Sequence, residues 1–261
     1  MKFGVCLDIS NEQDIRTVAA AGYDYFEGNY QFFANGDSDK KSFAKRLVAE
    51  SGLPVLAANC FLPGDLKTSG PERNDKALRE YILRGLDYAL PLGLKTVVFG
   101  SGGARNVPES LSFTESFLQT ADFLRTVALP IMRENGVTLC IEPLCRDCSD
   151  IFHTVKEGAM LAALAGDDCR VLADLYHMHV SGDDMRNIRD VGQLLRHAHI
   201  SNPTPPGMPG RRIFMHDVNE FDYKTFVDAL RAVGCETCSV EASVLDIEKD
   251  APAALSVLKE L

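Results

Sequence analysis

Four short motifs in the second half of the chain carry carboxylates and imidazoles at positions that could bind a cation. They are Ile141-Glu142-Pro143, Asp174-x-x-His177, His197-x-His199 and Val240-Glu241-Ala242. Three carboxylates and one imidazole suit a divalent ion such as Mn²⁺, Mg²⁺ or Co²⁺. Without a cation or protons, three clustered carboxylates would repel one another. The motifs therefore predict one divalent-metal site, provided that the fold brings them together.

The elements that must position these motifs alternate between short apolar runs and longer helical patterns. The predicted strands are 2–7, 23–27, 54–60, 96–100, 137–142, 170–174, 197–201 and 237–241. The predicted helices are 12–21, 40–51, 73–92, 114–135, 154–165, 185–191, 223–233 and 251–261. Eight strand–helix pairs in 261 residues predict a single (β/α)8 TIM barrel, with residues 1–261 as one domain. A doubly wound open sheet is the alternative, but no G-x-G-x-x-G follows the first strand.

In a TIM barrel, functional side chains lie at the carboxyl ends of the strands. Glu142, Asp174 and Glu241 end three of the last four predicted strands, and the H-x-H pair lies on the other. Neighbouring strands are about 4.8 Å apart, so side chains from four successive strands can reach one ion. Taken singly, each residue is better explained by solvation, helix capping or ordinary polar packing than by a role in a site. Their conjunction favours the metal site.

Several longer segments resemble a known family. IEPLCRDCSDIFHT, LADLYHM, HAHISNP and SVEA are similar to segments of the sugar phosphate isomerase/epimerase family, the xylose isomerase-like TIM barrels that include the ketose 3-epimerases. The resemblance is weak in the first half and clear from Gly136 onward. It implies that the metal ligands are Glu142, Asp174, His199 and Glu241, that the two glutamates are the acid/base pair, and that His177 contacts a substrate oxygen. It also implies a monosaccharide or close derivative as substrate and a homodimer or homotetramer.

The chemistry behind this expectation is proton transfer. A proton next to a carbonyl is acidic only when the enediolate is stabilised, which a divalent ion chelating the two substrate oxygens achieves. One carboxylate removes the proton and a second returns one on the opposite face. We therefore predict a one-metal sugar isomerase or epimerase. Three alternatives stay open: a lyase that dehydrates a keto-inositol or keto-sugar, an endonuclease IV-like DNA repair enzyme, and a non-catalytic sugar-binding barrel.

Two positions depart from the ketose 3-epimerases. Their E-x-L-x-R-x-E motif after strand five has its second glutamate replaced here by Cys148. Their arginine shortly after the metal histidine of strand seven has no counterpart in Asn202–Pro205, and Arg211 and Arg212 are the nearest. Both arginines are candidate substrate contacts, because guanidinium binds phosphate or carboxylate bidentately. A solvated surface pair is the alternative.

Other polar residues receive weaker assignments. The C-x-x-C pairs Cys145/Cys148 and Cys235/Cys238 do not combine into one zinc site, because strand alternation directs Cys238 toward the helices. His179 and His197 are interpreted as rim or packing residues. Glu27 is a candidate substrate contact, and Asn29 is either another or a helix N-cap.

The overall composition and charge disfavour several classes of partner. Lys and Arg total 27 against 37 Asp and Glu, a net charge of −10, which disfavours binding to a nucleic-acid backbone. No run reaches the roughly 18 apolar residues that span a membrane. The N-terminal segment lacks a signal peptide's apolar stretch, so the eight cysteines are expected to be thiols in a cytoplasm.

Overall fold

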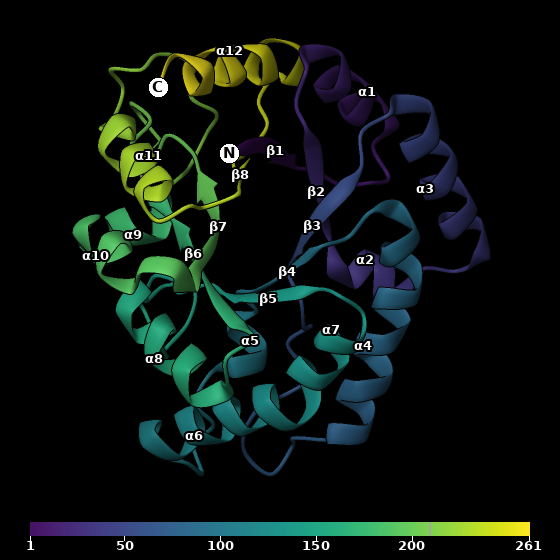
Figure 1. Cartoon of the computed structure of the whole chain (residues 1–261), viewed down its shortest axis with the longest axis vertical. Coiled ribbons are helices and arrows are strands. Elements are labelled where there is room, and N and C mark those ends of the chain that lie inside the picture. The colour runs from purple at the N-terminus through teal and green to yellow at the C-terminus, as the bar shows by residue number, and fades with distance from the viewer. Residues whose placement is uncertain (209) are drawn as a thin grey trace.

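The computed structural model describes residues 1–208 and 210–261, and these residues form a closed barrel of eight parallel strands (Figure 1). Each strand pairs with its sequence neighbours, and β8 pairs with β1. The (β/α)8 prediction is confirmed, and barrel closure excludes the open-sheet alternative. The strands are β1 (Lys2–Cys6), β2 (Tyr25–Asn29), β3 (Val55–Asn59), β4 (Thr96–Phe99), β5 (Thr138–Ile141), β6 (Cys169–Asp174), β7 (Leu195–Ile200) and β8 (Thr237–Val240).

Helices surround the barrel, and α12 packs beside α1 to close the ring (Figure 1). The helices that match predicted ones are α1 (Glu12–Ala21), α3 (Ser38–Ser51), α4 (Asp75–Ala89), α6 (Phe113–Phe123), α7 (Leu129–Glu134), α8 (Val155–Ala165), α10 (Arg186–Val191), α11 (Tyr223–Ala232) and α12 (Ile247–Glu260). The predicted helix 114–135 is divided between α6 and α7 by a π-helical turn at Leu124–Ala128, which ends two residues before Pro130. None of the helices among the described residues is long and apolar enough to cross a membrane.

Three short helices were not predicted from the sequence. They are α2 (Tyr30–Asn35), α5 (Gly102–Arg105) and α9 (Leu175–Ser181), and each follows a strand end at the rim of the barrel. Helices of one or two turns are too short to show a hydrophobic period. Asn29 caps α2 by accepting a hydrogen bond from the Gln31 N–H at 2.8 Å, which confirms the N-cap interpretation.

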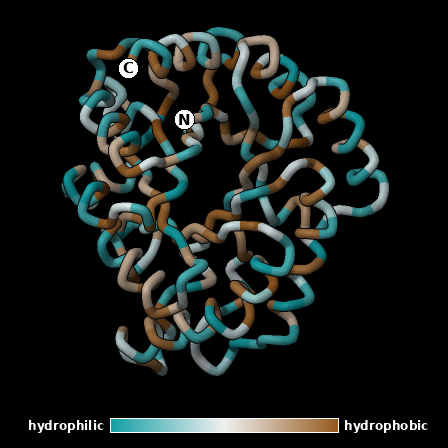
Figure 2. The backbone as a smooth tube through the Cα atoms, viewed as in Figure 1, coloured by the Kyte–Doolittle hydropathy of each residue, from teal (hydrophilic) through white to brown (hydrophobic). Residues whose placement is uncertain are grey.

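Two apolar layers lie on the two faces of the strands. Most buried side chains form one cluster between strands and helices, whereas Val98, Cys140 and Leu172 form a small separate cluster. Polar residues gather along the outer edges of the helices and loops (Figure 2). Inside the barrel, a Cβ atom at Gly4 would lie 2.3 Å from the Tyr25 ring, so glycine makes room for that side chain. The Tyr25 hydroxyl is 2.8 Å from Ser239 Oγ across the barrel.

Candidate metal and acid–base site

The four predicted metal ligands lie together at the carboxyl ends of β5–β8. One ligand atom each from Glu142, Asp174, His199 and Glu241 lies within 4.8 Å of the others, and we call these four residues the acidic cluster. His199 Nδ1 is at its centre, 3.1 Å from Glu142 Oε1, 3.6 Å from Asp174 Oδ2 and 3.0 Å from Glu241 Oε2. The acidic cluster therefore offers a cation three carboxylate oxygens and one imidazole nitrogen.

Glu27 lies beneath this cluster and fixes the orientation of His199. Its Oε1 atom is 3.1 Å from His199 Nε2, and its Oε2 atom accepts a hydrogen bond from Ser239 and lies 2.8 Å from His197 Nε2. Burial opposes ionisation of Glu27, but His199 and His197 hold its pKa well below the usual range. With Nε2 engaged by a carboxylate, Nδ1 of His199 faces the cluster, and it would be the ligand atom of a carboxylate–histidine–metal arrangement once a cation replaced its proton.

Of the two residues under His199, Glu27 differs from its sequence-based interpretation, whereas His197 is the packing residue of the two alternatives. Glu27 is fully buried and reaches only other side chains, so it is not a substrate contact. His197 is also fully buried within the barrel, with Nδ1 2.8 Å from Thr237 Oγ1, and does not lie on the rim. A charged residue inside the short strand YFEGN was the available signal, but its partners come from the far wall of the barrel.

The acidic cluster needs compensating positive charge. Burial alone favours a neutral imidazole, but Glu27, Glu241 and the other carboxylates raise the pKa of His199 well above its ordinary value. Glu241 Oε2 lies 3.0 Å from His199 Nδ1 and 2.8 Å from Arg212 Nη1, and its Oε1 accepts a hydrogen bond from Asn59 Nδ2 at 3.1 Å. Three carboxylates and one imidazole within 4.8 Å of one another are the hard oxygen and nitrogen donors that a divalent cation takes.

Glu142 is positioned by two neighbours at the end of β4. A Cβ atom at Gly100 would lie 2.3 Å from Glu142 Oε2, so only glycine leaves that carboxylate its place. The Arg105 guanidinium is fully buried and donates through Nη1 to the carbonyls of Phe99 and Glu142, at 2.9 and 2.8 Å. Arg105 therefore joins β4 to the residue that ends β5.

His177 lies beside the acidic cluster on α9. Its backbone N–H donates to Asp174 Oδ1 at 3.0 Å, which caps the helix. Its Nδ1 accepts the Cys145 N–H at 3.1 Å, so the neutral ring carries its proton on Nε2 and can donate it to a ligand oxygen. The ring is 5% exposed. These features are compatible with the predicted substrate contact.

The structure separates the two predicted arginines. Arg212 Nη1 lies 2.9 Å from Asp174 Oδ2 and 2.8 Å from Glu241 Oε2, and its guanidinium lies 5.2 Å from the centre of the Tyr176 ring. Arg211 is exposed, and its side chain has no hydrogen bond or ion pair with the described residues. Arg212 alone is therefore placed to reach a ligand at the acidic cluster.

The C-x-x-C pairs lie in different surroundings, as the alternation argument predicted. Cys235 and Cys238 are buried in the cluster between strands and helices. Cys145 and Cys148 lie in the loop after β5, with their Sγ atoms 3.7 Å apart.

The chain was compared with known proteins. The profile of the xylose isomerase-like TIM barrel family matches residues 15–261. No curated protein sequence matches the chain.

Several solved structures share the barrel over the whole chain, at sequence identities that show the fold alone. A D-psicose 3-epimerase crystallised with D-fructose superposes with a TM-score of 0.81 at 19% identity, covering 100% of this chain and 98% of the other. A 3-keto-D-glucoside 4-epimerase from E. coli gives 0.78 at 21% identity and covers both chains fully. A family 2 AP endonuclease from Brucella melitensis gives 0.76 at 19% identity and 98% coverage of each chain. With its family profile matched over residues 15–261, the chain belongs to the xylose isomerase-like TIM barrel family.

Proposed function

We propose that this protein is a divalent-metal-dependent sugar isomerase or epimerase that moves a proton at the carbon next to a carbonyl. The observation that carries the proposal is the convergence of Glu142, which follows β5, and Glu241, which follows β8. Their carboxylate oxygens lie 3.1 and 3.0 Å from His199 Nδ1. The printed names of two structural neighbours, a D-psicose 3-epimerase and a 3-keto-D-glucoside 4-epimerase, support a sugar as the substrate class.

The metal ligands in this proposal are the four residues of the acidic cluster. When bound, Mn²⁺, Mg²⁺ or Co²⁺ would act as a Lewis acid and stabilise negative charge developing on the sugar oxygens. Glu142 and Glu241 come from strands three places apart and exchange the proton on the two faces of the sugar. His177 donates from Nε2 to a sugar oxygen, and Arg212 provides a second, cationic donor.

A hollow of about 380 Å³ lies at the carboxyl ends of β1–β3, next to the acidic cluster. Asn59 belongs to both, because it lines the hollow and donates to Glu241 Oε1. Asp8 and Asn29 add further hydrogen-bonding groups to the lining. Polar groups around a concave space are what a polyhydroxylated ligand requires, and they support a monosaccharide-sized substrate.

The test is deuterium uptake from D₂O into a panel of ketoses, aldoses, their phosphates and inososes, with Mn²⁺ present and mass spectrometry as readout. We expect uptake with the wild-type protein and with Glu248→Gln, an exposed glutamate on α12. We expect none with Glu241→Gln. Uptake accompanied by loss of one water would instead identify the dehydratase.

Two results would contradict the proposal. Full uptake by Glu241→Gln would remove the acid/base assignment. Bound metal without uptake from any sugar in the panel would favour the non-catalytic sugar-binding barrel.

A further inference from the structure

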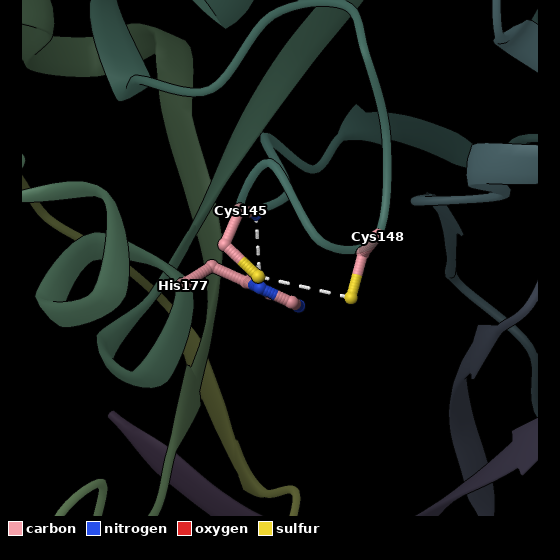
Figure 3. Close-up of side chains that lie close together, drawn as sticks. All are labelled: Cys145, Cys148 and His177. Carbon is pink, nitrogen blue, oxygen red and sulfur yellow. Dashed lines mark hydrogen bonds between the residues drawn. The ribbon is translucent and has the colours of Figure 1, made fainter. Parts of the chain in front are cut away.

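A second group of ligand-type side chains lies beside the acidic cluster, in the loop after β5 and on α9 (Figure 3). Cys145, Cys148 and His177 each place one ligand atom within 4.8 Å of the other two, and we call them the thiol cluster. Cys145 is buried and Cys148 is exposed, so the group opens to solvent at the rim. Neither cysteine has a role in the proton transfer proposed above.

The spacing of the two sulfur atoms fits a tetrahedral metal. Their separation is 3.7 Å. Two thiolates bound at about 2.3 Å in tetrahedral geometry lie about 3.8 Å apart. The C-x-x-C spacing is also that of many zinc sites, in which a tight turn presents both sulfurs to one ion. Here the Cys148 N–H closes the turn on the Cys145 carbonyl at 2.9 Å.

Contacts on both sides hold this turn in place. A Cβ atom at Gly102 would lie 2.0 Å from the Cys148 carbonyl oxygen, so α5 packs directly on the turn. On the other side, His153 Nδ1 is 2.9 Å from the Leu144 carbonyl oxygen. The sulfur atoms are therefore preorganised by their surroundings and need not be gathered by the ion.

A disulfide between the same two cysteines fits less well. The 3.7 Å between the sulfur atoms is a non-bonded distance, well beyond the roughly 2.05 Å of a covalent bond, so the two cysteines are thiols in this structure. Burial and the neighbouring Cys145 raise the pKa of Cys148 to about 11, whereas redox-reactive cysteines have lowered values.

We propose that Cys145 and Cys148, with His177 as a third and exchangeable ligand, form a binding site for a thiophilic divalent cation of the Zn²⁺ class. Binding forms two metal–sulfur bonds and releases the two thiol protons to solvent. His177 Nδ1 now accepts the Cys145 N–H, so coordination of the ion through Nδ1 requires the ring to give up that hydrogen bond. Occupancy of the thiol cluster by this route thus removes the hydrogen bond that now orients His177 beside the acidic cluster.

The experiment is a Co²⁺ titration of the reduced full-length protein, followed by near-ultraviolet absorption. Thiolate ligands give intense charge-transfer absorption, which an all-oxygen and nitrogen site such as the acidic cluster does not give. We expect this absorption with the wild-type protein and its loss in Cys148→Ser, whose side chain is exposed and tolerates substitution. We expect it to remain in Asp174→Asn, which removes an acidic-cluster ligand.

The second C-x-x-C pair supplies the matched control. Cys235 and Cys238 share the sequence spacing but lie in the apolar layer, and no group of candidate ligands among the described residues includes either. Cys235→Ser should therefore keep the absorption. Absence of absorption from the wild-type protein at excess Co²⁺, or its persistence in Cys148→Ser, would overturn the proposal.

This readout does not depend on turnover, so its failure and the failure of the proposed function are distinguishable. If the protein also exchanges sugar protons, Zn²⁺ added to the Mn²⁺-loaded enzyme should inhibit the wild type at lower concentration than it inhibits Cys148→Ser. Equal inhibition of the two proteins would separate the thiol cluster from the sugar site.

Discussion

The two halves of the barrel end in different chemistry, although their strands have similar lengths. The strands β5–β8 lead into Glu142, Asp174, His199 and Glu241, whereas β1–β4 lead into Cys6, Asn29, Asn59 and Gly100. The first half therefore supplies the amide side chains, the hollow that they line and Glu27, which holds His199 from inside the barrel. The second half supplies all four candidate metal ligands. The contrast teaches that the candidate ligands come from β5–β8 alone, whereas the residues that end β1–β4 shape the space opposite them.

The largest difference between the halves is expected for loss of a direct ligand. Asp174→Asn keeps the cap on α9 but removes one charged oxygen, and we expect Mn²⁺ affinity to fall more than about 100-fold. Asn59→Ala, on the opposite wall, removes only an outer hydrogen bond to Glu241 and should cost about tenfold. Isothermal titration calorimetry of both variants measures the difference. Equal losses would mean that the two walls contribute alike.

Gly100 tests how the first half shapes the second. In Gly100→Ala the new methyl group displaces the end of the flexible Glu142 side chain, so Mn²⁺ affinity should fall about 10- to 100-fold with little change in stability. Gly64→Ala is the matched control, because its Cβ atom would have only ordinary contacts, the nearest at 3.8 Å. Unchanged metal affinity in Gly100→Ala would show that Glu142 is not held against this glycine.

Arg105 joins the two halves and should matter for folding. Arg105→Met leaves the buried carbonyls of Phe99 and Glu142 without their donor, and we expect the free energy of unfolding to fall by about 2 kcal/mol. Arg105→Lys, which keeps one cationic donor, should lose less. The measurement is urea denaturation. Because a buried charge is itself unfavourable, unchanged stability in Arg105→Met would mean that desolvation of the guanidinium outweighs its two hydrogen bonds.

The strands and the acidic cluster were predictable for local reasons. Short apolar runs define each strand to within a few residues, and a carboxylate or histidine at the end of such a run must lie on the rim once the sheet is known to close. The pairing of Glu27 with His199 was not predictable, because those residues are 172 positions apart and meet only across the closed barrel.

Two other features also depend on tertiary contacts. Arg105 is buried and donates its hydrogen bonds to main-chain carbonyls. Every residue has a main-chain carbonyl, so no sequence motif identifies these partners. The adjacent residues Arg211 and Arg212 are chemically identical, so only the path of the loop decides which one turns inward. The assignment of ligands and of the acid/base pair stays a prediction until metal and sugar are tested.

That arginine pair gives a smaller effect with an unusual sign. Arg212 places a positive charge between Asp174 and Glu241, where it repels an incoming cation. Arg212→Gln should therefore raise Mn²⁺ affinity about tenfold, while Arg211→Gln changes it less than about twofold because that side chain is exposed. Competition titration against a metal indicator measures both. A fall in affinity with Arg212→Gln would show that this arginine supports the acidic cluster rather than opposing the cation.

The smallest effect concerns the amino-terminal ends of β6 and β8, where buried cysteines lie in place of the carboxylates found at the carboxyl ends. Burial raises the pKa of Cys169 and of Cys235 from 9.0 to about 12. Between these values the unfolded chain loses thiol protons that the folded chain retains, so stability is complete below pH 9 and falls as pH rises. At pH 10 each thiol should lower the free energy of unfolding by roughly 1 kcal/mol. Cys169→Val should remove its share of that loss when denaturation at pH 8 and pH 10 is compared, and an unchanged pH dependence would mean that Cys169 ionises as freely in the folded protein as in the unfolded chain.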